Sequence, residues 1–168
     1  RAPLSPPWPA PGYSWYPIGG LDGRDPGALT AAAEAVLAWA DEHAADAASI
    51  AFLGFSQGGA MSLQLLRLAP ERVAFAVNLS GCAAGGELPG DAILAETRPP
   101  VFWGRGSADE VIPESAIAHT AEWLPEHSEL IGRIYPGMGH SVSQEELTDL
   151  HHFLTLRYAA PTTAAPAS

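Results

Sequence analysis

The sequence predicts an α/β fold in which a mostly parallel sheet carries helices on both faces. Helix-like and strand-like segments alternate along the chain, and short apolar runs are typical of strands buried on both faces. In an open sheet of this kind, ligands bind outside the carboxyl ends of the strands. The expected elements are helix 26–43, strand 49–53, helix 58–68, strand 73–79, strand 101–103, helix 114–124, strand 130–135 and helix 143–158.

The two ends of the chain lack this alternation. Residues 1–17 contain six prolines, too many for a helix or a central strand. This segment is either a flexible leader or an ordered loop that lays its aromatic side chains over the ligand crevice, and aromatic residues favour the loop. These aromatic residues are Trp8, Tyr13, Trp15 and Tyr16. We expect residues 1–158 to form a single domain, with residues 1–25 as an irregular loop, and residues 159–168 to be a disordered tail.

Ser56 lies between a strand-like run and a helix-like segment, in the tract GFSQGG. The run 49–53 is apolar, and the following segment carries Met61, Leu65 and Leu68 at helical spacing until Pro70 ends it. A strand that turns at once into a helix strains the residue at the turn, requires small neighbours and pushes the side chain outward. A plain glycine-rich turn is the alternative, but the strand and helix on either side favour a nucleophilic serine.

His140 is the histidine best placed to serve as the base. It lies in the glycine-rich loop 135–141, directly after the expected strand 130–135, where catalytic side chains are often held. The other five histidines are expected to be exposed bystanders, and most of them lie in helix-like segments. They are His43, His119, His127, His151 and His152.

Asp109 is the expected third member, an acid that orients the imidazole. It follows the strand 101–103 in a loop of small residues, with Glu110 as the near competitor. Either acid could instead be a solvated loop residue or cap the helix after Pro113. The order serine, acid, histidine, each after a strand, is that of α/β-hydrolases and favours a triad.

The chain resembles the small carboxylesterase, phospholipase and acyl-protein thioesterase family. The segments that carry the resemblance are GFSQGGAMSLQLL, GRGSADEVIPES and YPGMGHSVSQEEL, together with residues 1–3 and 12–16. The resemblance covers most of the chain and implies an α/β-hydrolase fold with Ser56, Asp109 and His140 as the triad. It also implies that the backbone N–H of Gln57 is one donor to the oxyanion.

One feature of that family is missing from the sequence. Its members begin with a strand that ends in a His-Gly loop, whose backbone N–H is the second oxyanion donor, and no such segment is present. We therefore expect a truncated, processed or partial chain. An apolar strand edge beside the nucleophile strand should then be uncovered, and a stand-alone protein should have another chain there, as in a homo-oligomer.

Charge and composition exclude several classes of function. The formal net charge is −11, with 8 basic residues and no basic patch, so nucleic acid is not an expected partner. No apolar run approaches the length of about 20 residues that spans a membrane, and a cytoplasmic location is expected. The single cysteine, Cys82, is expected to be a buried thiol. No cluster of residues has metal-ligand spacing, and no metal or cofactor is expected.

These features together predict a serine hydrolase that cleaves carboxylic ester or thioester bonds through an acyl-enzyme. A small-molecule ester or thioester is the expected substrate. Trp15, Tyr16, Val111 and Met138 are candidates for its apolar site, and each is equally plausible as core. A peptidase or lactonase could use the same triad. The alternative from another class is a non-catalytic fragment or partner-binding module.

Overall fold

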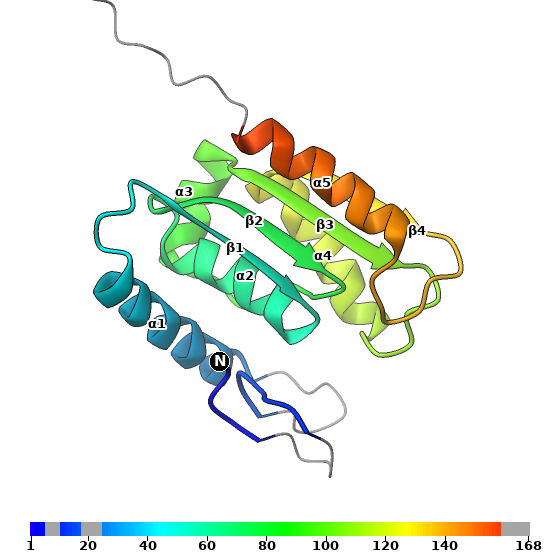
Figure 1. Cartoon of the computed structure of the whole chain (residues 1–168), viewed down its shortest axis with the longest axis horizontal. Coiled ribbons are helices and arrows are strands. Elements are labelled where there is room, and N and C mark those ends of the chain that lie inside the picture. Colours follow the sequence, from blue (N-terminus) through cyan, green and yellow to red (C-terminus); the bar gives the residue numbers. More distant parts are fainter. Residues whose placement is uncertain (6–10, 18–24, 159–168) are drawn as a thin grey trace, which may run out of the picture.

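The sheet is parallel and four-stranded, as the sequence predicts. The computed structural model describes residues 1–5, 11–17 and 25–158. Its strands lie in the order β1-β2-β3-β4, and every neighbouring pair is parallel (Figure 1). They are β1 Ile50–Phe55, β2 Val73–Leu79, β3 Pro100–Gly106 and β4 Glu129–Tyr135. Because all four strands run the same way, the loops after them meet at one edge of the sheet.

The helices agree with the prediction at most positions. They are α1 Pro26–His43, α2 Gln57–Leu68, α3 Pro89–Thr97, α4 Glu114–His127 and α5 Gln144–Tyr158. The sequence pattern does not predict α3, and it predicts that α4 ends at residue 124, before Pro125. A proline inside a helix lacks an N–H donor and crowds the carbonyl four residues before it, yet Pro125 lies within two residues of the end of α4, which continues to His127.

Two strands are longer than predicted because glycines stay in the ladder. Gly54 pairs with Asn78, so β1 continues to Phe55. In β3, Gly104 and Gly106 pair with Arg133 and Tyr135 of β4. The sequence predicts that these glycines lie in loops, whereas pairing with the neighbouring strands keeps them extended.

Helices pack on both faces of the sheet. On one face, residues of α2, α3 and α4 pack against β2 and β3. They include Leu63, Leu66, Leu94, Leu124, Val101 and Trp103. On the other face, α5 covers the sheet through Leu150 and Phe153 against Phe75, Val77, Leu79 and Phe102. The helix α1 packs beside α2 rather than on the strands (Figure 1).

The edge strand β1 carries exposed apolar side chains on one face of the sheet. In the described part of the chain β1 pairs only with β2, and Leu53 and Phe55 remain 55% and 38% exposed. The expectation of an uncovered apolar strand edge beside the nucleophile therefore agrees with the described residues. The predicted tail 159–168 and the placement of Trp8 lie outside them.

None of the described helices is long and apolar enough to cross a membrane. Cys82 is buried, as the sequence predicts.

Glu146 is a fully buried acid at the start of α5. Neither carboxyl oxygen has a hydrogen-bond partner among the described residues, and a Cβ on Gly104 would lie 2.2 Å from its Oε1. Burial raises the pKa of Glu146 above its ordinary value, and the nearby N–H of Ser143, outside hydrogen-bond geometry, offsets this only in part. The folded state therefore holds this proton more tightly than the unfolded state does.

We expect Glu146→Gln to flatten the dependence of stability on pH. Because the pKa of Glu146 is raised in the folded state, the contribution of its protonated form to stability is fully present below the ordinary glutamate value near 4.5. That contribution is lost as the pH rises through the folded pKa. The variant should gain in melting temperature relative to wild type between pH 4 and pH 8, because an amide carries no charge to desolvate. Glu145→Gln, at the exposed neighbouring position, is the control. An unchanged pH profile for Glu146→Gln would contradict this expectation.

Candidate active site

The structure brings Ser56, His140 and Asp109 together at the carboxyl ends of the strands. Ser56 follows β1, Asp109 lies in the loop after β3, and His140 lies in the loop after β4. His140 Nε2 is 2.8 Å from Ser56 Oγ, and His140 Nδ1 is 2.8 Å from Asp109 Oδ2. Glu110, the competing acid, is exposed and takes no part in this chain of hydrogen bonds.

Ser56 holds the strained conformation that the turn demands. Its φ is 55° and its ψ −117°, outside the regions that most residues occupy. The turn is tight because a Cβ on Gly54 would lie 2.0 Å from the carbonyl carbon of Gly58. The N–H of Ser56 donates to Leu79 O at 2.8 Å, which fixes the turn to the end of β2.

Asp109 is held as an ionised acceptor. Burial alone would raise the pKa of its carboxyl, but hydrogen bonds from His140 and from the N–H groups of Val111 and Ile112 outweigh burial and hold the pKa below its ordinary value. A carboxylate only accepts, so His140 Nδ1 carries the proton and Nε2 is left to accept from the Ser56 hydroxyl. Asp109 is not a helix cap, since Pro113 occupies the cap position of α4.

The loops that carry Asp109 and His140 are tied to each other. The N–H of Ala108 donates to Met138 O at 2.9 Å, and the N–H of Gly137 donates to Ser107 Oγ at 2.9 Å. The Phe55 ring lies against the His140 ring, with centroids 4.8 Å apart. These contacts leave the imidazole little freedom to turn.

Gln57 connects the turn to the aromatic segment before α1. It is the first residue of α2, so its backbone N–H has no acceptor within the helix and is free to meet a developing oxyanion. Its side-chain amide bonds residues 14–16: Oε1 accepts from the N–H of Trp15 and Nε2 donates to Tyr16 O, both at 2.9 Å. Residues 14–16 are thereby tied to the start of α2, and a loop that covers the ligand crevice stays a prediction.

A cavity of about 290 Å³ lies beside the first turn of α2. Tyr16, Leu29, Ala60 and Cys82 are among its lining residues, with Ser115 and His119 at the α4 side. Ala60 donates its N–H to Ser56 O, so the cavity begins one helical turn from the nucleophile. Its wall is mostly apolar, which suits a hydrocarbon group rather than a charged one.

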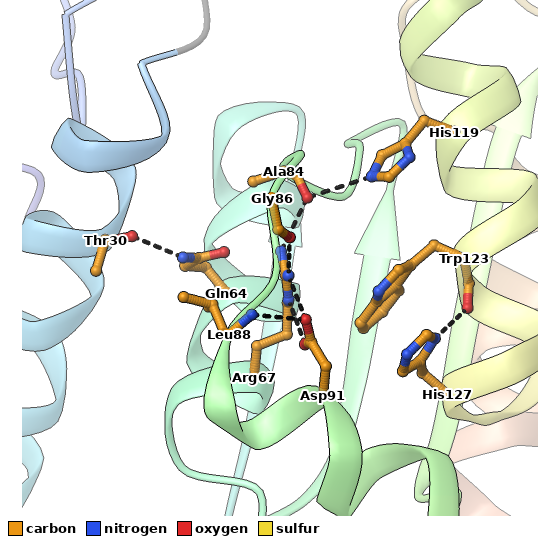
Figure 2. Close-up of polar contacts among 10 residues, drawn as sticks. All are labelled: Thr30, Gln64, Arg67, Ala84, Gly86, Leu88, Asp91, His119, Trp123 and His127. Atoms are coloured by element: carbon orange, nitrogen blue, oxygen red, sulfur yellow. Dashed lines mark hydrogen bonds and ion pairs between the residues drawn. The ribbon is translucent and has the colours of Figure 1, made fainter.

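A buried arginine bonds the segment after β2, and Ala84 of that segment lines the cavity (Figure 2). Arg67 of α2 bonds both carboxylate oxygens of Asp91 at 2.7 and 2.6 Å, and donates to Ala84 O and Gly86 O. His119 lies 3.3 Å from the same Ala84 O. The segment after β2 is thereby fixed from two sides.

The four predicted substrate-binding residues do not share one cavity. Tyr16 lines the 290 Å³ cavity, while Trp15 lines a separate hollow of about 400 Å³ beside Trp39 of α1. Val111 is exposed and Met138 half-buried, and neither is among the described lining residues of these two spaces. A substrate role for each of the four stays a prediction.

Several residues of the site were missed by the sequence reading. Phe55, Ser14, Cys82 and His119 gave no local signal, because their roles come from contacts across 35 or more residues of chain or from a shared cavity. The sequence makes Tyr16 a candidate for the substrate site, but it does not reveal that the side-chain amide of Gln57 bonds the Tyr16 carbonyl. Among the described residues, no group of three or more His, Cys, Asp or Glu side chains could hold a metal ion.

Comparison with known proteins gives matches over most of the chain. A profile of the phospholipase/carboxylesterase family matches residues 7–158. A protein of Oryza sativa subsp. japonica named as a probable carboxylesterase is 30% identical over 155 residues, 84% of this chain and 57% of that protein. The acyl-protein thioesterase 1 of Debaryomyces hansenii is 35% identical over 117 residues, 68% of this chain and 50% of that protein. The chain spans about half the length of these curated relatives.

Solved structures agree with the fold. SOBER1 of Arabidopsis thaliana superimposes with a TM-score of 0.72 at 24% identity, covering 86% of this chain and 74% of that one. A carboxylesterase from Mesorhizobium loti gives a TM-score of 0.72 at 22% identity, covering 94% and 73%. The α/β-hydrolase fold that the sequence predicts is therefore confirmed.

We expect Asp91→Asn to lower the free energy of unfolding by about 3–5 kcal/mol, because it leaves the buried Arg67 guanidinium without its counter-charge. Chemical denaturation followed by circular dichroism measures the loss. Asp41→Asn, which breaks the exposed pair with Arg72, should change stability by about 1 kcal/mol or less. Equal effects of the two substitutions would show that the Arg67 anchor is not a main source of stability.

Proposed function

The chain belongs to the phospholipase/carboxylesterase family, and on that basis we propose that it is a serine hydrolase of carboxylic esters or thioesters that works through an acyl-enzyme. The observation that carries the proposal is the pair of 2.8 Å contacts that His140 makes with Ser56 Oγ and Asp109 Oδ2. Relatives named carboxylesterase and acyl-protein thioesterase support the substrate class.

The first half of the proposed reaction forms the acyl-enzyme. Ser56 Oγ attacks the carbonyl carbon of the substrate while its proton passes to His140 Nε2. The carbonyl oxygen becomes an oxyanion that the N–H of Gln57 stabilises at the positive end of α2. When the intermediate collapses, His140 gives the proton to the leaving alcohol or thiol, and the acyl group stays on Ser56.

The second half returns the free enzyme. Water attacks the acyl carbon as His140 Nε2 takes one of its protons, and a second tetrahedral intermediate forms. That proton then passes to Ser56 Oγ as the acid is released. Each step uses the three side chains, the Gln57 N–H and water.

Asp109 acts through His140 in this scheme. Its carboxylate fixes the tautomer that leaves Nε2 free, and it stabilises the imidazolium that forms in each half-reaction. The two N–H groups that bond its Oδ1 keep Oδ2 aimed at the ring. The lowered pKa of Asp109 keeps this negative charge present at neutral pH.

A partner-binding module is the second candidate function. The edge strand β1, with Leu53 and Phe55 exposed on one face of the sheet, favours it, since an unpaired edge strand with apolar side chains is a surface on which another chain can pair. The two candidates differ in one property: only an assembled hydrolase site makes Ser56 nucleophilic.

We expect Ser56→Ala to abolish both turnover of a chromogenic acetate ester and labelling by a fluorophosphonate. The probe reacts with a serine only where a base activates it, so wild type should carry the adduct on Ser56, located by mass spectrometry. Ser141→Ala, at the exposed serine next to His140, is the control. A folded wild-type chain that takes no label would favour the partner-binding module.

We expect Asp109→Asn to lower kcat by about 10⁴-fold, because the amide can donate to Nδ1 and favour the wrong tautomer. Steady-state kinetics with the same ester measure the loss. Glu110→Gln, one residue further on and exposed, should keep kcat close to wild type. If Glu110→Gln were the damaging substitution, the assignment of the acid would be wrong.

A further inference from the structure

We propose that the side-chain amide of Gln57 is a positioning group that fixes one wall of the 290 Å³ cavity and so determines how well the site accepts long acyl groups. This inference rests on the proposed hydrolase function. It concerns the side chain alone, whereas the oxyanion interaction belongs to the backbone N–H of the same residue.

The contacts of the amide leave it no freedom of orientation. Oε1 accepts from the backbone N–H of Trp15, and Nε2 donates to the backbone carbonyl of Tyr16. A backbone N–H can only donate and a carbonyl can only accept, so the two ends of the amide are assigned by their partners. An apolar side chain of similar size can satisfy neither partner.

Ser14 completes the connection. Its hydroxyl has a single proton, which goes to the nearer acceptor, Tyr16 O at 2.6 Å, and leaves Gln57 Oε1 as the longer contact at 3.1 Å. Ser14 is buried and is paired through its backbone with Leu4. The Tyr16 carbonyl therefore receives hydrogen bonds from two side chains, and Gln57 provides the one that comes from α2.

Tyr16 transmits this placement to the cavity. The residue is 5% exposed and lines the cavity together with Leu29 of α1 and Ala60 of α2. Gln57 lies next to Ser56, while Ala60 lies one turn further on. The same residue thus sets the position of the cavity wall relative to the atom that attacks the substrate.

The size and lining of the cavity identify the group it takes. Its volume is close to the lower end of the range for ligand pockets. The lining residue one helical turn from Ser56 is Ala60, and the polar lining residues are Asp25, Ser115 and His119. An acetyl group is too short to extend a helical turn from Ser56, whereas an unbranched acyl chain of medium length can reach it. Displacement of Tyr16 should weaken binding of the long chain and leave the short one unaffected.

The experiment compares p-nitrophenyl acetate with p-nitrophenyl octanoate in the 168-residue chain. For Gln57→Met, we expect kcat/KM for octanoate to fall about tenfold, mainly through KM, because the hydrogen bonds that hold Tyr16 are lost. The quantity that decides is the ratio of octanoate to acetate kcat/KM, which should fall about tenfold in Gln57→Met whatever change the acetate rate itself shows. Ser14→Ala should also lower kcat/KM for octanoate, by a smaller factor. This variant serves as the test if Gln57→Met does not fold.

The matched control is Gln64→Met. Gln64 is a buried glutamine of the same helix, and its Nε2 bonds Thr30 of α1 at 2.8 Å (Figure 2). This substitution should lower stability without changing the ratio of octanoate to acetate kcat/KM.

Two results would overturn the inference. One is an equal fall in kcat/KM for acetate and octanoate in Gln57→Met, which would indicate damage to the reacting groups. The other is a selectivity change in Gln64→Met as large as in Gln57→Met, which would indicate general loosening. A wild-type chain that hydrolyses neither ester and takes no label would instead overturn the proposed function, so the two failures are distinguishable.

Discussion

The left-handed backbone of Ser56 is the constraint on which the rest of the site depends. A residue with φ of 55° and a side chain is strained, and it persists only where the surroundings hold it. Here Gly54 lets α2 start within van der Waals contact of β1, and burial of Leu63 and Leu66 keeps α2 against the sheet. The strain directs the hydroxyl out of the turn, toward the loop that carries His140.

The parallel sheet supplies the other two groups at that position. Asp109 and His140 are 31 residues apart, but the loops after β3 and β4 leave the sheet side by side and bond each other through Ala108 and Met138. The charge of Asp109 is then maintained by two N–H groups of its own loop. The site is therefore a product of strand direction and loop contacts, and no single segment of the chain contains it.

The local pattern of the sequence predicts the parts of this structure whose signals lie close together in the chain. The strand and helix around Ser56, and the glycine-rich loops around Asp109 and His140, were recognisable because each signal lies within about ten residues of the group it supports. Helix α3 was missed because the interaction that anchors it, the Arg67–Asp91 pair, joins positions 24 residues apart. The hydrogen bond between Gln57 and Tyr16 joins positions 41 residues apart, so no local pattern in the sequence predicts it.

Ser56 should carry an acyl group during turnover, and this intermediate can be trapped. The chain is mixed with p-nitrophenyl acetate, quenched in acid within the first turnovers, digested and examined by mass spectrometry. We expect an acetyl group on the peptide that contains Ser56 in wild type, and none on the corresponding peptide of Ser56→Ala. Ester turnover that continues in Ser56→Ala, with no acetylated Ser56 peptide in wild type, would contradict it.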